Sequence, residues 1–397
     1  MWPFYFMKKS QVAMIVWIFS LVLNQDSFSM EADIQCAIDF GSIHVKLSCF
    51  KINQEEIFEE IYRNEKCISL QGGIHKGILS EDAQTKAIGA IKELLFEAKV
   101  NPEKTKVIGI ATAWARKAKN SLDLIERIKA ETKVVIEIID QEKEGEIAFD
   151  AAQSELRILL LDKNSFLYQT DSGQKIRDKI TEKNKKNLLF PQHIMSWDIG
   201  GGSMQFTIIN KDNKTEVFGN TMGAIPFAKL VINELQKDSQ DTPNPLNAKQ
   251  AKSCIKLAMK KAEETIDAGF AQHMQSSDPV VFGVGPGHKI IRRNIYKLLK
   301  VQPENSYMQS DLAKAVLLLI NMDDNEIADR LGIKPLEAKI VLTGMLLILG
   351  HMKYFNIDKV HTLDVNGTLG VLFYNLKRSM KPILAICAHP LEKVKVD

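Results

Sequence analysis

A short glycine-rich segment in the middle of the chain limits the fold most strongly. Residues 193–197 read as a buried strand, Asp198 follows it, residues 200–203 are three glycines and a serine, and a second apolar run occupies 206–209. This order predicts a hairpin whose turn carries almost no side chains. Successive glycine N–H groups can then point at one anion, and the aspartate can hold a hydrated cation beside it. A hairpin with a purely structural role is the alternative interpretation.

A second copy of this pattern near the start of the chain favours ligand binding. Residues 36–47 again run from strand to Asp39, Gly41 and Ser42 and then to a second strand. The two aspartates lie about a domain's length apart in the sequence. A repeat at this spacing predicts two similar lobes, each offering a phosphate-binding hairpin to a shared cleft.

Length and composition set broader limits. With 397 residues, the chain is long enough for two or three domains with their own cores. It is 45% hydrophobic and 25% charged, as is usual for globular proteins. The formal net charge is only +3, which argues against nucleic acid as a partner. The five cysteines show neither CxxC spacing nor clustering with histidine, so no structural zinc site is expected.

Residues 1–29 have the pattern of a cleavable signal peptide. Two lysines at 8–9 precede an apolar run at 12–23, which is too short to span a bilayer, and small residues follow at 27 and 29. We therefore expect export to the periplasm, with membrane anchoring by an uncleaved segment as the alternative. Met7 is a second candidate start of translation.

Two further expectations follow for an exported chain. No membrane span is expected after signal removal, because the longest later apolar run, 340–349, is too short and reads as a core helix. Disulfides become permissible. Cys36 and Cys49 sit symmetrically about the first turn, so a hairpin would place them opposite each other. A cross-strand disulfide is conceivable, but we expect two buried thiols.

Apolar periodicity predicts alternating strands and helices through the first half of the chain, which indicates an α/β lobe over residues 34–161. Residues 162–192 break the pattern with clustered lysines. They are predicted to form a basic surface insertion, with a flap that attracts a polyanion as the sharper alternative. The second lobe is then predicted over 193–397.

Several segments match motifs in a fixed order. Residues 39–42 match Asp-x-Gly-Ser, 112–120 are similar to Thr-Ser-Ala-x-Arg-x-Ala-x-Asn, 139–145 are similar to a segment with a catalytic glutamate, and 198–203 match Asp-Ile-Gly-Gly-Gly-Ser. Together they resemble the exopolyphosphatase/guanosine pentaphosphatase (Ppx/GppA) phosphatases, and the resemblance extends over roughly 34–378. It implies an α/β fold of two RNase H-like lobes (the actin/Hsp70/sugar kinase superfold) around a central cleft.

The resemblance also implies a reaction, in which terminal phosphate is released from polyphosphate or guanosine pentaphosphate by Mg²⁺-assisted attack of water. Carried over residue by residue, it implies Glu144 as the group that activates the water, Arg116 as a charged catalytic partner, Asp39 and Asp198 as the residues that hold Mg²⁺, and Gly41, Ser42, Gly200, Gly201, Gly202 and Ser203 as the phosphate-binding set. Without the resemblance, Glu144 reads as a solvent-facing helix residue and Arg116 as a surface partner for a carboxylate.

Departures from the motifs keep other functions open. Gln205 stands where the family has glutamate, and residues 285–288 replace its Gly-Gly-Thr loop. These changes predict an altered substrate preference or reduced activity. A non-hydrolytic polyphosphate- or alarmone-binding protein is one alternative. An ATP-dependent kinase or ATPase of the same superfold is another, favoured by the glycines of 283–287. The sequence leaves a homodimer open.

Overall fold

The computed structural model describes residues 33–52, 58–68, 70–161, 194–210, 214–236, 241–267 and 279–379 except 366, together with isolated positions between these ranges. The predicted signal peptide, 1–29, lies outside the described residues, as does most of the predicted basic insertion, 162–192. Neither prediction is tested by the fold.

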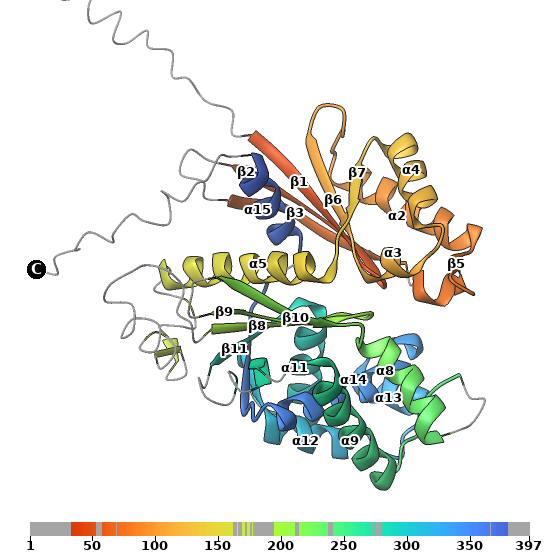
Figure 1. Cartoon of the computed structure of the whole chain (residues 1–397), viewed down its shortest axis with the longest axis vertical. Helices are drawn as coiled ribbons and strands as arrows, with labels where there is room; N and C mark the ends of the chain where they lie inside the picture. The colour runs from red at the N-terminus through yellow and green to blue at the C-terminus, as the bar shows by residue number, and fades with distance from the viewer. Residues whose placement is uncertain are drawn as a thin grey trace, which may run out of the picture.

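The first sheet has five strands in the order β3-β2-β1-β6-β7. β1, β2 and β3 form an antiparallel meander, and β6 and β7 run parallel to β1. Two helices cover one face of this sheet (Figure 1), and Ser80 caps the first of them by accepting a hydrogen bond from the Ala83 amide. The strands are β1 (Asp33–Phe40), β2 (His44–Ile52), β3 (Phe58–Cys67), β6 (Lys106–Ala111) and β7 (Val135–Ile138), and the helices are α2 (Glu81–Glu97) and α4 (Ser121–Thr132).

Short elements connect these strands and helices. They are η1 (Leu70–Gly73), β4 (Ile74–His75), β5 (Ile78–Leu79) and α3 (Ala113–Lys117). β4 and β5 pair with each other in a small antiparallel sheet. The last of the connecting elements, α3, follows β6 directly and begins at the end of that strand.

The second sheet repeats this plan. Its six strands run in the order β10-β9-β8-β11-β13-β12, with β8, β9 and β10 as an antiparallel meander and β11 and β13 added in parallel. The predicted repeat of two α/β lobes is therefore confirmed in the topology. The strands are β8 (Ile194–Ile199), β9 (Met204–Ile209), β10 (Thr215–Asn220), β11 (Val280–Val284), β12 (Ser306–Met308) and β13 (Lys359–Thr362).

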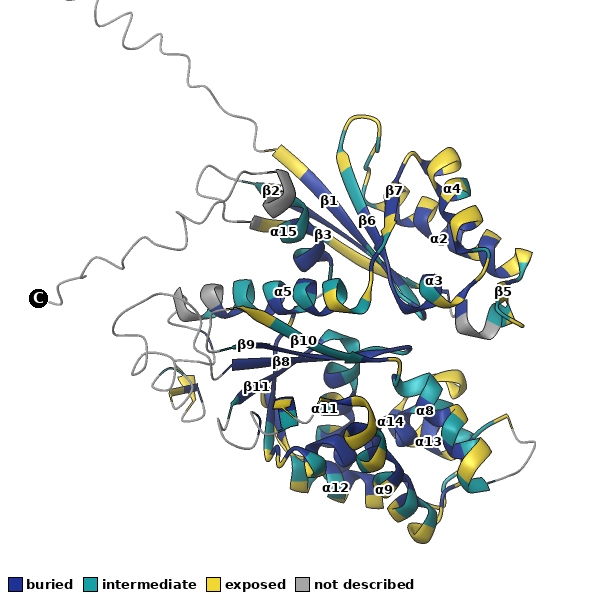
Figure 2. Cartoon of the chain, in the orientation of Figure 1, coloured by how far each residue is buried: buried dark blue, intermediate teal, exposed yellow. Residues whose placement is uncertain are grey.

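Helices pack on the outer face of the second sheet around a large apolar core. The most buried of them is α14 (Pro335–Tyr354), which Figure 2 shows in dark blue among its neighbours. By length and composition alone α14 could cross a membrane, but 72% of its most apolar window is buried inside the protein. The others are α8 (Ala224–Val231), η2 (Ile232–Gln236), α9 (Ala248–Thr265), α11 (Gly285–Leu299), α12 (Gln309–Leu317) and α13 (Asp324–Leu331).

Two helices lie between the sheets and link them (Figure 1). α5 (Gln141–Leu161) places Phe149 in one apolar cluster with Ile194 of β8, whereas α15 (Gly367–Ser379) packs Leu372 against Ala37 of β1. The predicted second lobe, 193–397, therefore contains a helix that belongs spatially to the first sheet. The physical reason is that α2 and α4 cover only one face of that sheet, so its other apolar face needs α15.

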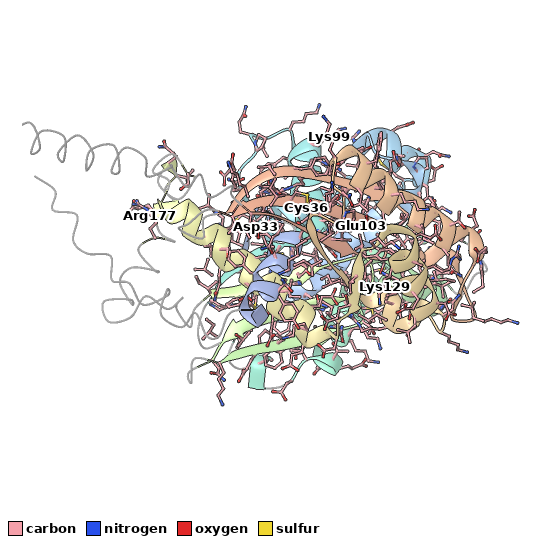
Figure 3. All side chains as sticks on the ribbon, turned by 90° about the horizontal axis from the view of Figure 1, so that it is seen from above. Asp33, Cys36, Lys99, Glu103, Lys129 and Arg177 are labelled. Atoms are coloured by element: carbon pink, nitrogen blue, oxygen red, sulfur yellow. A yellow bond between two sulfur atoms is a disulfide. The ribbon has the colours of Figure 1, made fainter. Side chains whose placement is uncertain are left out.

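The first hairpin carries a disulfide. Cys36 of β1 and Cys49 of β2 are direct cross-strand partners and are bonded to each other, with a Cα–Cα distance of 4.0 Å. Cys36 lies within the first sheet (Figure 3). The expectation of two buried thiols is wrong, because the register aims both side chains at the same face of the sheet.

Candidate active site

The two predicted turns have the same backbone form. In the first, the Gly41 N–H donates to the His44 carbonyl at 3.0 Å, and in the second the Gly200 N–H donates to the Ser203 carbonyl, also at 3.0 Å. Each turn therefore closes between two strands of its own meander, directly after β1 or β8, in which the aspartate is the next-to-last residue. When the two turns are aligned on these hydrogen bonds, Ser203 takes the position of His44 and not that of Ser42.

The two turns touch. A Cβ added to Gly201 would lie 2.6 Å from Cδ1 of Ile43, so a side chain here would have to displace the end of Ile43. The start of α8 supports the second turn, because the Ala224 and Ile225 amides donate to the Gly200 and Gly201 carbonyls. The N–H groups of Gly201 and Gly202 donate to no residue that the structure describes. They are therefore available for an anion, as the phosphate prediction requires.

Asp39 and Asp198 lie in one electrostatic environment. Burial and the charges of Glu144 and Asp39 together raise the pKa of Asp198 to about 7, with the Lys46 charge opposing them. Burial also raises the pKa of Glu144, with the Arg116 charge opposing and Asp39 adding to the effect. The structure thus brings together the three predicted carboxylates, Asp39, Glu144 and Asp198.

Lys46 is a site residue that the sequence reasoning missed. It is the cross-strand partner of Asp39 on β2, and its amine lies 3.2 Å from Asp39 Oδ2. Burial opposes the charged amine, but the charge and hydrogen bond of Asp39, together with the charges of Glu65 and Asp198, outweigh burial and raise the pKa of Lys46. The sequence signal was available, since Asp39 and Lys46 are symmetric about the first turn. Gln205 holds the same position opposite Asp198.

Glu144 is held by two partners in the first turn of α5. Arg116 Nη2 donates to Glu144 Oε2 at 2.8 Å, and the Ser203 hydroxyl donates to Glu144 Oε1 at 3.3 Å. The Glu144 side chain is only 13% exposed, so its interpretation as a solvent-facing residue is wrong. Without the family resemblance, Arg116 is predicted to pair with a carboxylate at the surface. It does pair with a carboxylate, but that carboxylate is Glu144.

The position of Arg116 follows from local packing. Trp114 is fully buried, and its ring N–H donates to the Phe40 carbonyl at 2.7 Å, which fastens α3 to the end of β1. A second guanidinium nitrogen of Arg116 donates to the Ile139 carbonyl at 2.8 Å. Arg116 therefore joins α3, the segment before α5 and Glu144 in one fixed arrangement.

Lys117 adds a second missed cation. Its amine approaches the Gly202 carbonyl at 3.4 Å, so it reaches from the first lobe to the second turn. Burial lowers the pKa of Lys117, and the nearby charges of Arg116 and Lys229 lower it further. These three cations repel one another, and a bound anionic ligand would relieve that repulsion.

Two helix starts face the aspartates at close range. A Cβ on Gly285, where φ is +78°, would lie 2.2 Å from Asp198 Oδ1, and a Cβ on Gly367 would lie 2.8 Å from Asp39 Oδ2. The N-termini of α11 and α15 thus point positive helix ends at the two carboxylates. A side chain at either position would press on the carboxylate, and at Gly285 the positive φ also favours glycine.

A cavity of ≈ 400 Å³ opens beside the Asp39–Lys46 pair. Its walls come from both halves of the chain, which agrees with the predicted shared cleft. The residues that line it include His44, Lys46 and Arg63 from the first sheet and Gly285, Pro286 and Lys289 from α11.

The donor set fits a hydrated Mg²⁺ better than a directly bound metal. Among the described residues, no three His, Cys, Asp or Glu side chains are arranged to coordinate one ion directly. Nevertheless, the charges of Asp39 and Glu144 both raise the pKa of buried Asp198, so a nearby cation would relieve their repulsion. Mg²⁺ commonly keeps several waters and uses one or two carboxylates, which suits Asp39 and Asp198.

The repeated sheets and facing turns define a two-lobed α/β protein of the actin-like class. The family model for Ppx/GppA phosphatases matches residues 50–163, so the resemblance drawn from the motifs is confirmed. A curated relative, the bifunctional 3-dehydroquinate synthase/phosphatase of Fusobacterium nucleatum, is 21% identical over 349 residues. The match covers 85% of this chain but 46% of the relative, so the chain spans less than half of that protein's length.

Solved structures share the fold over most of the chain. The Ppx/GppA family member of Aquifex aeolicus superposes with a TM-score of 0.61 at 21% identity, covering 88% of this chain and 99% of the other. An exopolyphosphatase from Cytophaga hutchinsonii gives a TM-score of 0.64 at 20% identity, with the same coverages of 88% and 99%. At these identities the likeness shows the fold, and the activity has to be argued from the site.

Proposed function

We propose that this chain is a phosphohydrolase that releases terminal phosphate from polyphosphate, with guanosine pentaphosphate as the other candidate substrate. The observation that carries the proposal is the placement of Glu144. It is buried, bound by Arg116 and Ser203, and shares its electrostatic environment with Asp39 and Asp198. Phosphoryl transfer to water requires a base, a phosphate-binding turn and paired acids at one place.

Each site residue has its own role in the proposed reaction. Glu144 accepts the proton of the attacking water, and its raised pKa suits a group that must hold a proton. Arg116 orients Glu144 and keeps N–H groups beyond its two hydrogen bonds for a phosphate oxygen. Ser42 and the available N–H groups of Gly201 and Gly202 cradle the phosphate, and the N–H groups of Gly41 and Gly200 close the two turns that present them. A hydrated Mg²⁺ held by Asp39 and Asp198 would supply charge neutralisation for the phosphoryl oxygens.

Two observations support polyphosphate over the nucleotide. The cavity beside Asp39 is lined by three cations, Lys46, Arg63 and Lys289, and one acid, Glu65, an excess of positive charge that suits a long polyanion. The Cys36–Cys49 disulfide supports export, because disulfides persist in oxidising compartments, away from cytoplasmic nucleotides. We therefore also propose a periplasmic location.

Two other functions make different use of the same residues. A non-hydrolytic binding protein is favoured by Gln205, which puts a neutral side chain opposite Asp198. The glycines of 283–287 favour an ATP-dependent enzyme on the sequence alone. Gly285 and Gly287 pack against Asp198 Oδ1 and the Ile199 carbonyl, so close packing already explains why these positions are glycine.

A phosphate-release assay on the purified chain separates these functions. We expect Mg²⁺-dependent release that is fastest with polyphosphate, slower with guanosine pentaphosphate and slowest with ATP, and abolished by EDTA. Tight polyphosphate binding without release would instead support the binding protein. Release that is fastest with ATP would overturn the proposal in favour of the ATP-dependent enzyme.

A further inference from the structure

Unpartnered amide atoms are buried between α5 and the second sheet. Gln205 is only 1% exposed, and neither its Oε1 nor its Nε2 has a hydrogen-bond partner among the described residues. Gln141 Nε2 is buried and unpartnered in the same way. Such groups are costly when left unpaired, and in folded proteins they are commonly satisfied by ordered water.

The two amides occupy neighbouring positions on one face of the sheet. Gln205 on β9 pairs with Asp198 on β8 and with Gly219 on β10. Gln141, the first residue of α5, lies over Gly219, with its Nε2 3.5 Å from the position that a Cβ there would take. The missing side chain of Gly219 makes room for the Gln141 amide beside Gln205.

The space around the Gln205 and Gln141 amides adjoins Glu144. Ser203, two positions before Gln205 on the same face, donates to Glu144 Oε1, and Gln141 precedes Glu144 by three residues, about one helical turn. The first hairpin offers a contrast. There the position of Gln205 is held by Lys46, whose amine is already engaged by Asp39. The second hairpin thus keeps a hydrogen-bonding group uncommitted beside the base.

We propose that Gln205 and Gln141 bind an ordered water against Glu144 and so position the water that attacks the substrate. The inference rests on the proposed function. Gln205 Oε1 accepts one hydrogen of the water, Glu144 accepts the other, and Gln141 Nε2 donates to one lone pair. The remaining lone pair forms the new bond to the terminal phosphorus while the bridging P–O bond breaks. Glu144 takes the proton, and the shortened chain leaves with the electron pair. Both glutamines are positioning residues.

Crystallography tests the water site without relying on activity. In the metal-free wild-type protein, we expect an ordered water within hydrogen-bond distance of both amides, and its loss in Gln205→Met, which has a similar shape but no amide. A direct hydrogen bond between the two glutamines, or a closed space without water, would overturn the inference.

Kinetics tests the role in positioning. We expect Gln205→Met and Gln141→Met to lower kcat for polyphosphate hydrolysis about 10²-fold, with KM changed less than about twofold, because a misplaced nucleophile affects the chemical step. Gln205→Glu keeps an acceptor oxygen and should retain more kcat than Gln205→Met. Thr207→Val is the matched control, since Thr207 lies on the same strand and face but bonds the Gly145 carbonyl at 3.2 Å. Its kcat should stay at the wild-type value.

The possible outcomes are distinguishable. An unchanged kcat in Gln205→Met, or an equal loss in Thr207→Val, contradicts the positioning role. A wild-type protein that releases no phosphate contradicts the proposed function, and with it the positioning role. The crystallographic experiment then still decides whether the glutamines form a water site.

Discussion

Glu144→Gln lowers kcat for phosphate release by about 10²–10⁴-fold, the range typical of losing a general base. Glutamine has nearly the same shape and keeps an oxygen for the Arg116 bond, so the fold and the substrate contacts should survive. It cannot accept the proton of the attacking water. The measurement is initial-rate phosphate release from polyphosphate at saturating Mg²⁺, and KM should change little.

Glu146→Gln provides the control for this experiment. Glu146 lies on the same helix, pairs with Lys143 at 2.7 Å and is 36% exposed, so its loss removes only a surface ion pair. Its kcat should equal that of the wild type. Equal rates in wild type and Glu144→Gln would remove Glu144 from the reaction.

Asp198→Asn abolishes Mg²⁺-dependent release and, in metal-free protein, raises stability at pH 8. The pKa of Asp198 is raised by burial and by neighbouring acids to about 7 from 3.8. The folded protein therefore binds this proton more tightly than the unfolded chain does. The stabilisation is fully present below pH 3.8 and is lost as pH rises through about 7. Above pH 7 the loss amounts to at most roughly 4 kcal/mol.

Urea unfolding in EDTA at pH 5 and pH 8 measures this effect. The asparagine variant should gain more stability over wild type at pH 8 than at pH 5, because it lacks the buried charge. Asp358→Asn, at an exposed position, should show no such difference. A wild-type stability that increases from pH 5 to pH 8 relative to Asp198→Asn would contradict the assignment of a raised pKa.

The parts of the site that were predictable from the sequence are local in the chain. Asp39 and Asp198 each lie next to last in a strand and precede a glycine turn, so hairpin chemistry alone places them at equivalent positions. Symmetry about the first turn would also have revealed Lys46 and the Cys36–Cys49 pairing. The sequence favours thiols over a disulfide at this pair only because buried thiols are the commoner state.

Other features depend on contacts between distant segments. The burial of Glu144 requires α5 to lie between two sheets, and no short-range pattern reveals which face of α5 meets the second turn. The packing of α15 is a second example. It covers a face of the first sheet, and β1 in that sheet lies more than 300 residues earlier in the chain. Gln141 had no sequence signal, because its significance comes from Gly219 beneath it.

A calorimetric titration of Mg²⁺ into wild type, Asp39→Asn and Asp198→Asn tests the central claim most directly, namely that turns from the two halves of the chain hold one ion. The account predicts one Mg²⁺ per wild-type chain and its loss in both variants, because neither carboxylate holds the hydrated ion alone. Mg²⁺ binding that survives either substitution unchanged would contradict it.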